Sequence, residues 1–179
     1  MAVVNGNSNN NFLSGNTLEE NTLYGFEGKD TLQGGNLADS LDGGLGQDVY
    51  VIGNGVDVIY EIGVETNVLD YSQVVLDGKE VRATKDGNDL VLNIYTAENN
   101  TIDSSIRLTE YFDSQTEYNI LLSNGLNLNL NKQKLQSLGI GVEFKLIQKA
   151  SSIDSMLNVQ DYNYTSNQHG AVLVGNSAN

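Results

Sequence analysis

The chain of 179 residues contains no cysteine, no proline and no tryptophan, and its single histidine is His169. Without cysteine, it can form neither disulfide bonds nor thiolate metal sites. With one histidine, it cannot build a two-histidine zinc helix, and any Ser-His-Asp arrangement would have to use His169. The sequence also lacks a nucleophile-elbow motif, a phosphate-binding loop and a dinucleotide-binding fingerprint. We therefore expect no catalytic residues and no enzymatic activity in this chain.

Basic residues are few, with 9 Lys and Arg against 23 Asp and Glu, so the net charge is −14. This balance argues against nucleic acid and anionic lipid as partners, because both are bound by basic side chains. It favours cations. No apolar run is long enough to span a membrane, and the apolar start of the chain is too short for a cleaved signal peptide. If the chain is exported, we expect its export signal to lie elsewhere.

A nine-residue repeat occupies residues 25–60, which read GFEGKDTLQ, GGNLADSLD, GGLGQDVYV and IGNGVDVIY. The sixth position of each unit is aspartate, and an apolar residue follows two positions later. These residues are Asp30, Asp39, Asp48 and Asp57, with Leu32, Leu41, Tyr50 and Ile59. Glycine opens or nearly opens each unit, although Phe26, Leu37 and Ile52 replace it at three positions. Upstream, Asn21 occupies the repeat position of the aspartates but carries an amide. Asn11 resembles the same position, displaced by one residue.

Each unit divides into a six-residue turn and a three-residue strand. Glycine permits backbone angles that direct carbonyl groups into the turn, and the aspartate adds a carboxylate. Oxygen ligands of this kind suit Ca²⁺, which accepts six to eight of them. Carboxylates on strands stacked about 4.8 Å apart repel each other by about 1 kcal/mol in water and by more when partly buried. We therefore expect the repeats to be loose or unfolded at low calcium and ordered at high calcium.

The pattern Gly-Gly-x-Gly-x-Asp-x-apolar-x resembles the repeats-in-toxin (RTX) nonapeptide of haemolysin-type calcium-binding proteins. The resemblance implies a right-handed parallel β-roll with two units per turn, so that the Asp30 loop lies beside the Asp48 loop and the Asp39 loop beside the Asp57 loop. At least two Ca²⁺ ions would occupy these gaps, with a weaker third site between the Asn21 and Asp39 loops. Loop carbonyls would complete each site near Gly28, Gly35, Gly44, Gly46, Gly53 and Gly55.

After residue 62 the repeat stops, and short alternating segments are separated by turn dipeptides such as Asp86-Gly87 and Asn124-Gly125. We expect an all-β chain in three parts. Residues 1–62 form the roll, with degenerate repeats at 5–24 and well-formed ones at 25–60, residues 63–150 form an antiparallel β capping region, and residues 151–179 form a tail. Strands are expected at residues 74–76, 80–84, 89–95, 105–111 and 118–122, and a short helix at 131–138. Parts of this region also resemble the segment that follows the repeats in haemolysin-type proteins.

The resemblance implies a secreted, extracellular protein, because RTX proteins leave the cell through type I ABC export machinery that reads an uncleaved C-terminal segment, and residues 151–179 look like such a segment. One interpretation is a calcium-binding module at the C-terminal end of a larger toxin, enzyme or adhesin. Another is a small stand-alone protein for calcium-dependent adhesion at a cell surface. A third is recognition of a host-surface protein or carbohydrate, with Tyr95, Tyr111, Phe112 and Tyr118 as candidate contacts. The sequence leaves these alternatives open.

Overall fold

We analysed a computed structural model of the chain, which describes most of the first 147 residues. The described residues are 1–74, 79–96, 98–122, 127–130, 132–137, 143–147 and 171–172. Most of them lie in β-strands, and the helix among them has five residues, so the chain is all-β as expected. In this part of the chain, no helix has the length and apolar character needed to cross a membrane.

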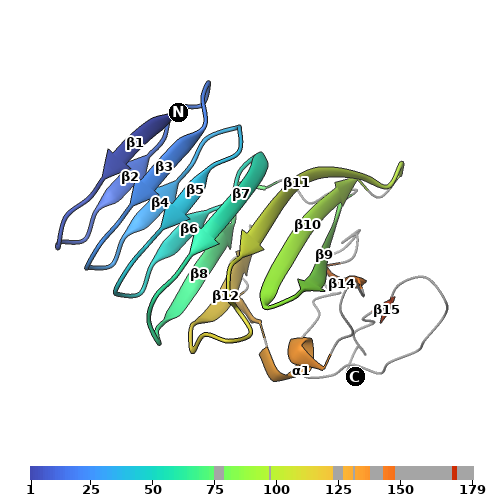
Figure 1. The fold of residues 1–179 in the computed structure, drawn as a ribbon. Helices are drawn as coiled ribbons and strands as arrows, with labels where there is room; N and C mark the ends of the chain where they lie inside the picture. Colours follow the sequence, from blue (N-terminus) through green and yellow to red (C-terminus); the bar gives the residue numbers. More distant parts are fainter. Residues whose placement is uncertain are drawn as a thin grey trace.

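The strands from β1 to β6 are short, and those from β7 to β12 are longer (Figure 1). The N-terminal strands are β1 (Ala2–Asn5), β2 (Phe12–Ser14), β3 (Asn21–Tyr24), β4 (Thr31–Gln33), β5 (Ser40–Asp42), β6 (Val49–Val51), β7 (Gly55–Tyr60) and β8 (Thr66–Tyr71). The later elements are β9 (Lys79–Asp86), β10 (Asp89–Thr96), β11 (Thr101–Leu108), β12 (Glu117–Leu122), β13 (Asn127–Asn129), α1 (Lys132–Gln136), β14 (Glu143–Ile147) and β15 (Ala171–Val172).

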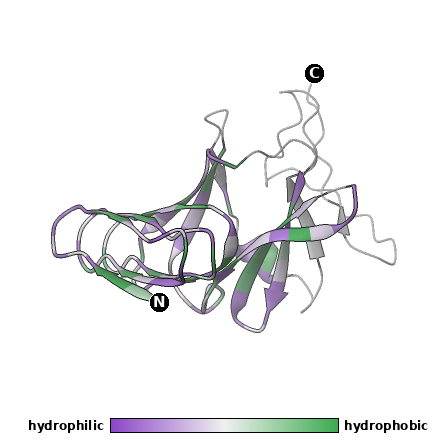
Figure 2. Ribbon diagram, turned by 90° about the horizontal axis from the view of Figure 1, so that it is seen from above, coloured by the Kyte–Doolittle hydropathy of each residue, from purple (hydrophilic) through white to green (hydrophobic). Residues whose placement is uncertain are grey.

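The chain passes back and forth between two sheets. One sheet has the order β1-β3-β5-β7-β11-β10-β9-β14-β15, and the other has the order β13-β12-β8-β6-β4-β2. From β1 to β8 the strands alternate between the sheets, and neighbours within each sheet are parallel. Seen from above in Figure 2, the successive turns of this N-terminal part overlie one another. Residues of one unit therefore lie beside residues about two units away in the sequence.

The apolar position of each repeat fills the space between the two sheets. In the three-residue strands β2, β4, β5 and β6 the central residue is buried and its neighbours are more exposed, because successive side chains point to opposite faces. The inward residues are Leu13, Leu23, Leu32, Leu41, Tyr50, Ile59 and Leu69, and all are buried. Parallel pairing places them in register, as with Leu23 beside Leu41 and Leu41 beside Ile59. Burial of such a side chain contributes about 1.5–3 kcal/mol.

Parallel pairing does not end at residue 62, which corrects the expected boundary between a parallel and an antiparallel region. Strand β8 pairs with β6, β11 pairs with β7, and β12 pairs with β8, all in parallel. Buried alternate residues such as Leu69 and Tyr71 maintain the register here without the glycine motif. The antiparallel part consists of β9, β10 and β14 beyond β11 in one sheet and of β13 beyond β12 in the other.

The expected elements after the repeats are mostly present with shifted ends. The segments 80–84, 89–95, 105–111 and 118–122 correspond to β9 to β12, and the Asp86-Gly87 turn joins β9 to β10. The helix is shorter than expected, at Lys132–Gln136. Residues 75–76 of the expected strand at 74–76, the Asn124-Gly125 turn and all of the tail at 151–179 except β15 lie outside the described residues.

The four aromatic residues considered as candidate contacts of a recognition surface belong to the core, which is the role that the sequence favoured for them. Tyr95, Tyr111, Phe112 and Tyr118 are all buried. The Tyr111 hydroxyl donates a hydrogen bond to the Leu130 carbonyl at 2.9 Å, and its ring lies 5.0 Å from the Phe112 ring, edge to face. Their role is therefore packing, because burial of an aromatic ring contributes more than that of most side chains.

Candidate metal centres in the stacked loops

The loops between successive strands form two rows, one at each edge of the paired sheets. The first row contains the loops at 6–11, 25–30, 43–48 and 61–65, and the second contains those at 15–20, 34–39 and 52–54. Loops of one row approach each other closely. The Gly28 amide donates to the Leu45 carbonyl at 2.9 Å, and the Leu45 amide donates to the Phe26 carbonyl at 2.7 Å. This stacking follows from the parallel register of the strands on either side.

In the first row, the aspartates and two asparagines form a ladder of hydrogen bonds. The Asn11 amide donates to Asp30 Oδ1 at 2.7 Å, and the Asp30 amide donates to Asp48 Oδ1 at 2.7 Å. The Asp48 amide then donates to Asn67 Oδ1 at 2.8 Å. The predicted adjacency of the Asp30 and Asp48 loops is thus confirmed.

The second row has the same arrangement. The Asn21 amide donates to Asp39 Oδ1 at 2.7 Å, and the Asp39 amide donates to Asp57 Oδ1 at 3.0 Å. Asp39 and Asp57 are therefore neighbours, as predicted. In both rows, the backbone amide of one loop holds one carboxylate oxygen of the next loop.

The other oxygen of these carboxylates is buried without a partner. Oδ2 of Asp30, Asp39 and Asp48 is inaccessible to solvent and accepts no hydrogen bond from the described residues. Nor does any described lysine or arginine pair with these aspartates. A buried carboxylate oxygen without a partner is costly, because it has lost its water and gained nothing in return. Each of these positions requires a proton or a cation.

Backbone carbonyl oxygens surround the same positions. A Cβ atom at Gly25 would lie 2.5 Å from both Asp30 Oδ2 and the Gly43 carbonyl oxygen, so these two oxygens share one small region between the first-row loops. In the second row, a Cβ at Gly35 would lie 2.7 Å from the Asn16 carbonyl oxygen, and one at Gly53 would lie 3.1 Å from the Gly35 carbonyl oxygen. Glycine at these positions leaves carbonyl oxygens free to face the next loop.

The six glycines predicted to flank metal sites all lie in these two rows. Gly28, Gly44 and Gly46 belong to the first row, and Gly35, Gly53 and Gly55 lie in or next to loops of the second. Their neighbours are oxygens of the adjacent loop. The donor set of carboxylates and carbonyls fits a hard cation such as Ca²⁺, which prefers oxygen ligands at 2.3–2.6 Å. No group of three or more His, Cys, Asp or Glu side chains converges within the described residues. An ion here would therefore depend on one or two carboxylates and on backbone carbonyls.

Replacement of Gly46 by alanine tests the close approach of the loops. Gly46 has φ +132°, and a methyl group there would collide with the Gly28 carbonyl oxygen of the adjacent loop. We expect Gly46→Ala to lower the free energy of unfolding by about 3 kcal/mol or more, through backbone strain and overpacking. Gly87→Ala is the control, because Gly87 also has positive φ (62°) but has no atom within 4 Å of its Cβ position. It should cost about 1 kcal/mol. Equal losses in urea denaturation would contradict close loop stacking.

Burial and the charges of neighbours raise the pKa values of these carboxyl groups. Burial raises the pKa of Asp48 to about 6. A hydrogen bond from the Asp30 amide lowers this pKa, and the charges of Asp30, Glu65 and Asp42 raise it. Burial, with the Asp39 charge, raises the pKa of Asp57 to about 7. The pKa of Asp30 is also raised by burial. Folding without a cation therefore favours protonated carboxyl groups.

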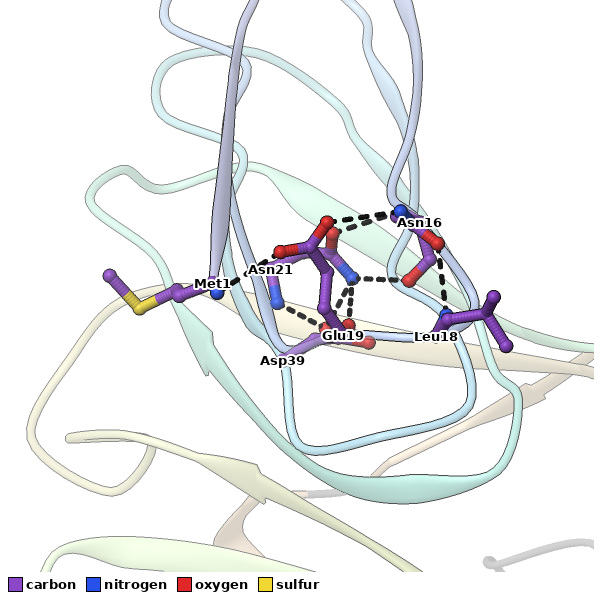
Figure 3. Close-up of polar contacts among 6 residues, drawn as sticks. All are labelled: Met1, Asn16, Leu18, Glu19, Asn21 and Asp39. Carbon is purple, nitrogen blue, oxygen red and sulfur yellow. Dashed lines mark hydrogen bonds and ion pairs between the residues drawn. The ribbon is translucent and has the colours of Figure 1, made fainter.

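Asn21 occupies the ladder position of an aspartate, but its side chain is fully engaged (Figure 3). Its Nδ2 donates to the carbonyl oxygens of Asn16 and Glu19 at 2.9 and 2.8 Å and to Asp39 Oδ1 at 2.8 Å, and its Oδ1 accepts from the Asn16 amide at 2.9 Å. The amide nitrogen of Asn21 thus donates to three oxygens at the place where the sequence predicts a weak third site, between the Asn21 and Asp39 loops.

The sequence patterns assigned no role to Asn67, near the start of β8, or to Glu61. Asn67 joins the ladder 19 residues after Asp48, and Asn11, which the sequence shows one residue out of step, joins it 19 residues before Asp30. The signal that could have identified Asn67 is the Asn-x-apolar pattern of Asn67 and Leu69, displaced by one residue from the repeat. Glu61 lies where a unit would begin with glycine, and no pattern in the sequence indicated its position near Asp48.

Comparison of the chain with protein-family models gave no match, and comparison with curated proteins gave no match either. The resemblance to RTX repeats therefore depends on the motif itself. The functional argument depends on the loop geometry and its unpartnered oxygens.

Proposed function

We propose that this chain is a calcium-binding module of RTX type, a right-handed parallel β-roll that folds on Ca²⁺ in the extracellular medium. The observation that supports this most strongly is the set of buried Oδ2 atoms of Asp30, Asp39 and Asp48, which lack partners in the described part of the chain, with Asp30 Oδ2 close to the Gly43 carbonyl oxygen of the next loop. Bound calcium would neutralise these carboxylates. Because the loops come together only in the folded chain, the free energy of binding would become free energy of folding.

Two ions would occupy the gaps between well-formed repeats. The first would lie between the loops ending at Asp30 and Asp48, with Asp30 Oδ2 and the Gly43 carbonyl as ligands. The second would lie between the loops ending at Asp39 and Asp57, with Asp39 Oδ2 and carbonyls near Gly35 and Gly53. The aspartate Oδ1 atoms would keep the loops in register through the amide ladder.

Direct counting of bound ions tests this proposal. Isothermal titration calorimetry and native mass spectrometry of the full chain should find at least two Ca²⁺ ions, with dissociation constants of about 10⁻⁴–10⁻³ M, as is common for extracellular modules. Mg²⁺ should bind far more weakly, because it requires a compact octahedral site. A chain that is folded and binds no calcium would contradict the proposal.

The same properties suit export by a type I ABC transporter. At the low calcium of the cytosol, the unpartnered carboxylates oppose folding, so the chain can pass through a channel in an extended state. Millimolar calcium outside the cell then drives folding and hinders return. In this setting the chain would be the C-terminal part of a secreted toxin, enzyme or adhesin, with a binding and not a catalytic role. Residues 151–179, proposed as the export signal, lie outside the described residues except for β15.

A second candidate function is recognition of carbohydrate, on aromatic residues other than those first considered. Tyr24 and Phe26 are exposed and stacked, with ring centroids 6.2 Å apart, and they line a groove of about 320 Å³ together with Asp42 and Ile62. Exposed aromatic faces beside a carboxylate can hold the apolar face and the hydroxyl groups of a sugar ring.

This second function predicts that Tyr24→Ala weakens binding to a glycan array at least tenfold, because the ring supplies the stacking surface. The calcium affinity should not change, since Tyr24 lies outside the aspartate ladders. Phe12→Ala is the matched control, because Phe12 is an exposed aromatic residue of the other sheet. Equal binding by the parent chain and the Tyr24 variant would remove this candidate.

A further inference from the structure

Three side-chain oxygens lie close together beside Gly43, in the last loop of the first row that belongs to the repeats. A Cβ atom at Gly43 would collide with Asp48 Oδ2, with the Tyr50 hydroxyl and with Glu61 Oε1. Asp48 is fully buried, and its Oδ2 has no partner in the described part of the chain. The Tyr50 hydroxyl accepts a hydrogen bond from the Gly43 amide at 3.0 Å and donates one to Glu61 Oε1.

This arrangement differs from the earlier loops in one respect. Beside Gly6 and beside Gly25, the oxygen of the following loop is a backbone carbonyl, from Gly25 at 2.7 Å and from Gly43 at 2.5 Å of the Cβ position. Beside Gly43, the following loop begins with Glu61, and a carboxylate oxygen lies at 2.6 Å. The place of a neutral ligand is thus taken by a charged one.

The gap between these two loops consequently carries two carboxylates close together. One Tyr50 hydroxyl group can satisfy one oxygen of Glu61, but it leaves Asp48 Oδ2 without a partner. Glu61 forms no ion pair with a described lysine or arginine. The two carboxylates of this gap therefore have no cationic partner among the described side chains.

We infer that a further calcium ion binds between the 43–48 loop and the loop that begins at Glu61, with Asp48 Oδ2 and the Glu61 carboxylate as its charged ligands. This inference extends the proposed calcium function to a site outside the repeats. Two carboxylates and nearby carbonyls suit Ca²⁺ better than Mg²⁺, because Ca²⁺ tolerates irregular sets of oxygen ligands.

This ion would join the repeats to the β-region that follows them. Glu61 lies at the end of β7, and its loop leads directly into β8. Strand β8 pairs with β6 on one side and with β12 on the other. An ion that bridges Asp48 and Glu61 would therefore fix the loop between β7 and β8. Folding of the repeats would then also position β8 and its neighbour β12.

The test compares Glu61→Gln with Glu65→Gln in the full chain. Glu65 lies in the same loop, but its Oε2 accepts a hydrogen bond from the Val64 amide at 2.9 Å and is exposed to solvent at this contact. By calorimetry and native mass spectrometry, Glu61→Gln should bind one calcium ion fewer than the parent chain, and Glu65→Gln should bind the same number. An equal number and affinity for Glu61→Gln, in a parent chain that binds at least two ions, would overturn this inference alone. A parent chain that binds none would overturn the proposed function.

Terbium luminescence gives a second measurement that does not depend on how the Glu61 variant folds. Tb³⁺ replaces Ca²⁺ at oxygen sites and is sensitised by a tyrosine within a few ångströms. Tyr50→Phe should reduce the tyrosine-sensitised emission by roughly one third or more, because the Tyr50 hydroxyl lies at the inferred site. Tyr95→Phe is the control, because Tyr95 lies on β10, which pairs with β9 and β11 away from the Glu61 loop. Emission that is equal in the two variants would contradict an ion beside Tyr50.

Discussion

Without calcium, the chain should show little β-sheet signal in far-UV circular dichroism, and calcium should restore that signal cooperatively. Magnesium at the same concentration should not. An ion present at a hundred times its dissociation constant stabilises the folded state by about 2.7 kcal/mol, so two ions contribute about 5 kcal/mol. That amount equals the whole stability of many domains. We therefore expect calcium to decide whether this chain is folded.

Two sets of variants separate the charge of the aspartates from their shape. Replacement of Asp30, Asp39, Asp48 and Asp57 together by alanine removes the ladder oxygens that accept from backbone amides, and it should abolish folding at any calcium concentration. Replacement of all four by asparagine keeps those acceptors and removes the charges. This variant should fold without calcium and should not respond to it.

Asn21 supports the expected behaviour of the asparagine variant. It occupies a ladder position, is buried, and satisfies its own amide with loop carbonyls and Asp39 Oδ1 without a metal. If the asparagine variant still required calcium at the midpoint of the parent chain, the assignment of the ions to these aspartates would be wrong.

In the absence of calcium, acidification should stabilise the folded chain. The folded-state pKa values of Asp48 and Asp57 are raised from 3.8 to about 6 and about 7. Between pH 4 and pH 7 the folded state therefore binds more protons than the unfolded state, and its stability falls as the pH rises. A shift of one pKa unit corresponds to about 1.4 kcal/mol, so the shift at Asp57 alone costs about 4 kcal/mol at neutral pH.

Far-UV circular dichroism in the presence of a calcium chelator measures this effect at pH 5 and pH 7.5. The β-sheet signal should be larger at pH 5. Saturating calcium should reduce the difference, because the ion replaces the proton as the partner of these carboxylates. Lower general repulsion in a chain of net charge −14 would act in the same direction. Asp57→Asn therefore serves as the control and should show a smaller pH dependence than the parent chain. A β-sheet signal that rises with pH would contradict the raised pKa values.

The repeat by itself determined the local structure of the first sixty residues. Apolar residues at intervals of nine, such as Leu32 and Leu41, predict short strands with one inward side chain, and the structure confirms their burial. The resemblance of the repeat to the RTX nonapeptide implies that the Asp30 and Asp48 loops lie side by side, and the ladder confirms it. These features follow from the sequence because each unit is a local structure that is repeated with little change.

Only the tertiary structure decided what each carboxylate oxygen contacts. In the ladder aspartates, Oδ1 accepts a hydrogen bond from a backbone amide 18 or 19 positions away in the sequence, whereas Oδ2 of Asp30, Asp39 and Asp48 has no partner among the described residues. This difference depends on the exact register of the two sheets. The burial of Tyr111 and Tyr118, the hydrogen bonds of the Asn21 side chain and the approach of Glu61 to Asp48 have the same origin. The parallel pairings of β11 with β7 and of β12 with β8, each about fifty residues apart in the chain, are further cases. Register between distant strands is chosen by the packing of the whole core, and no local pattern specifies it.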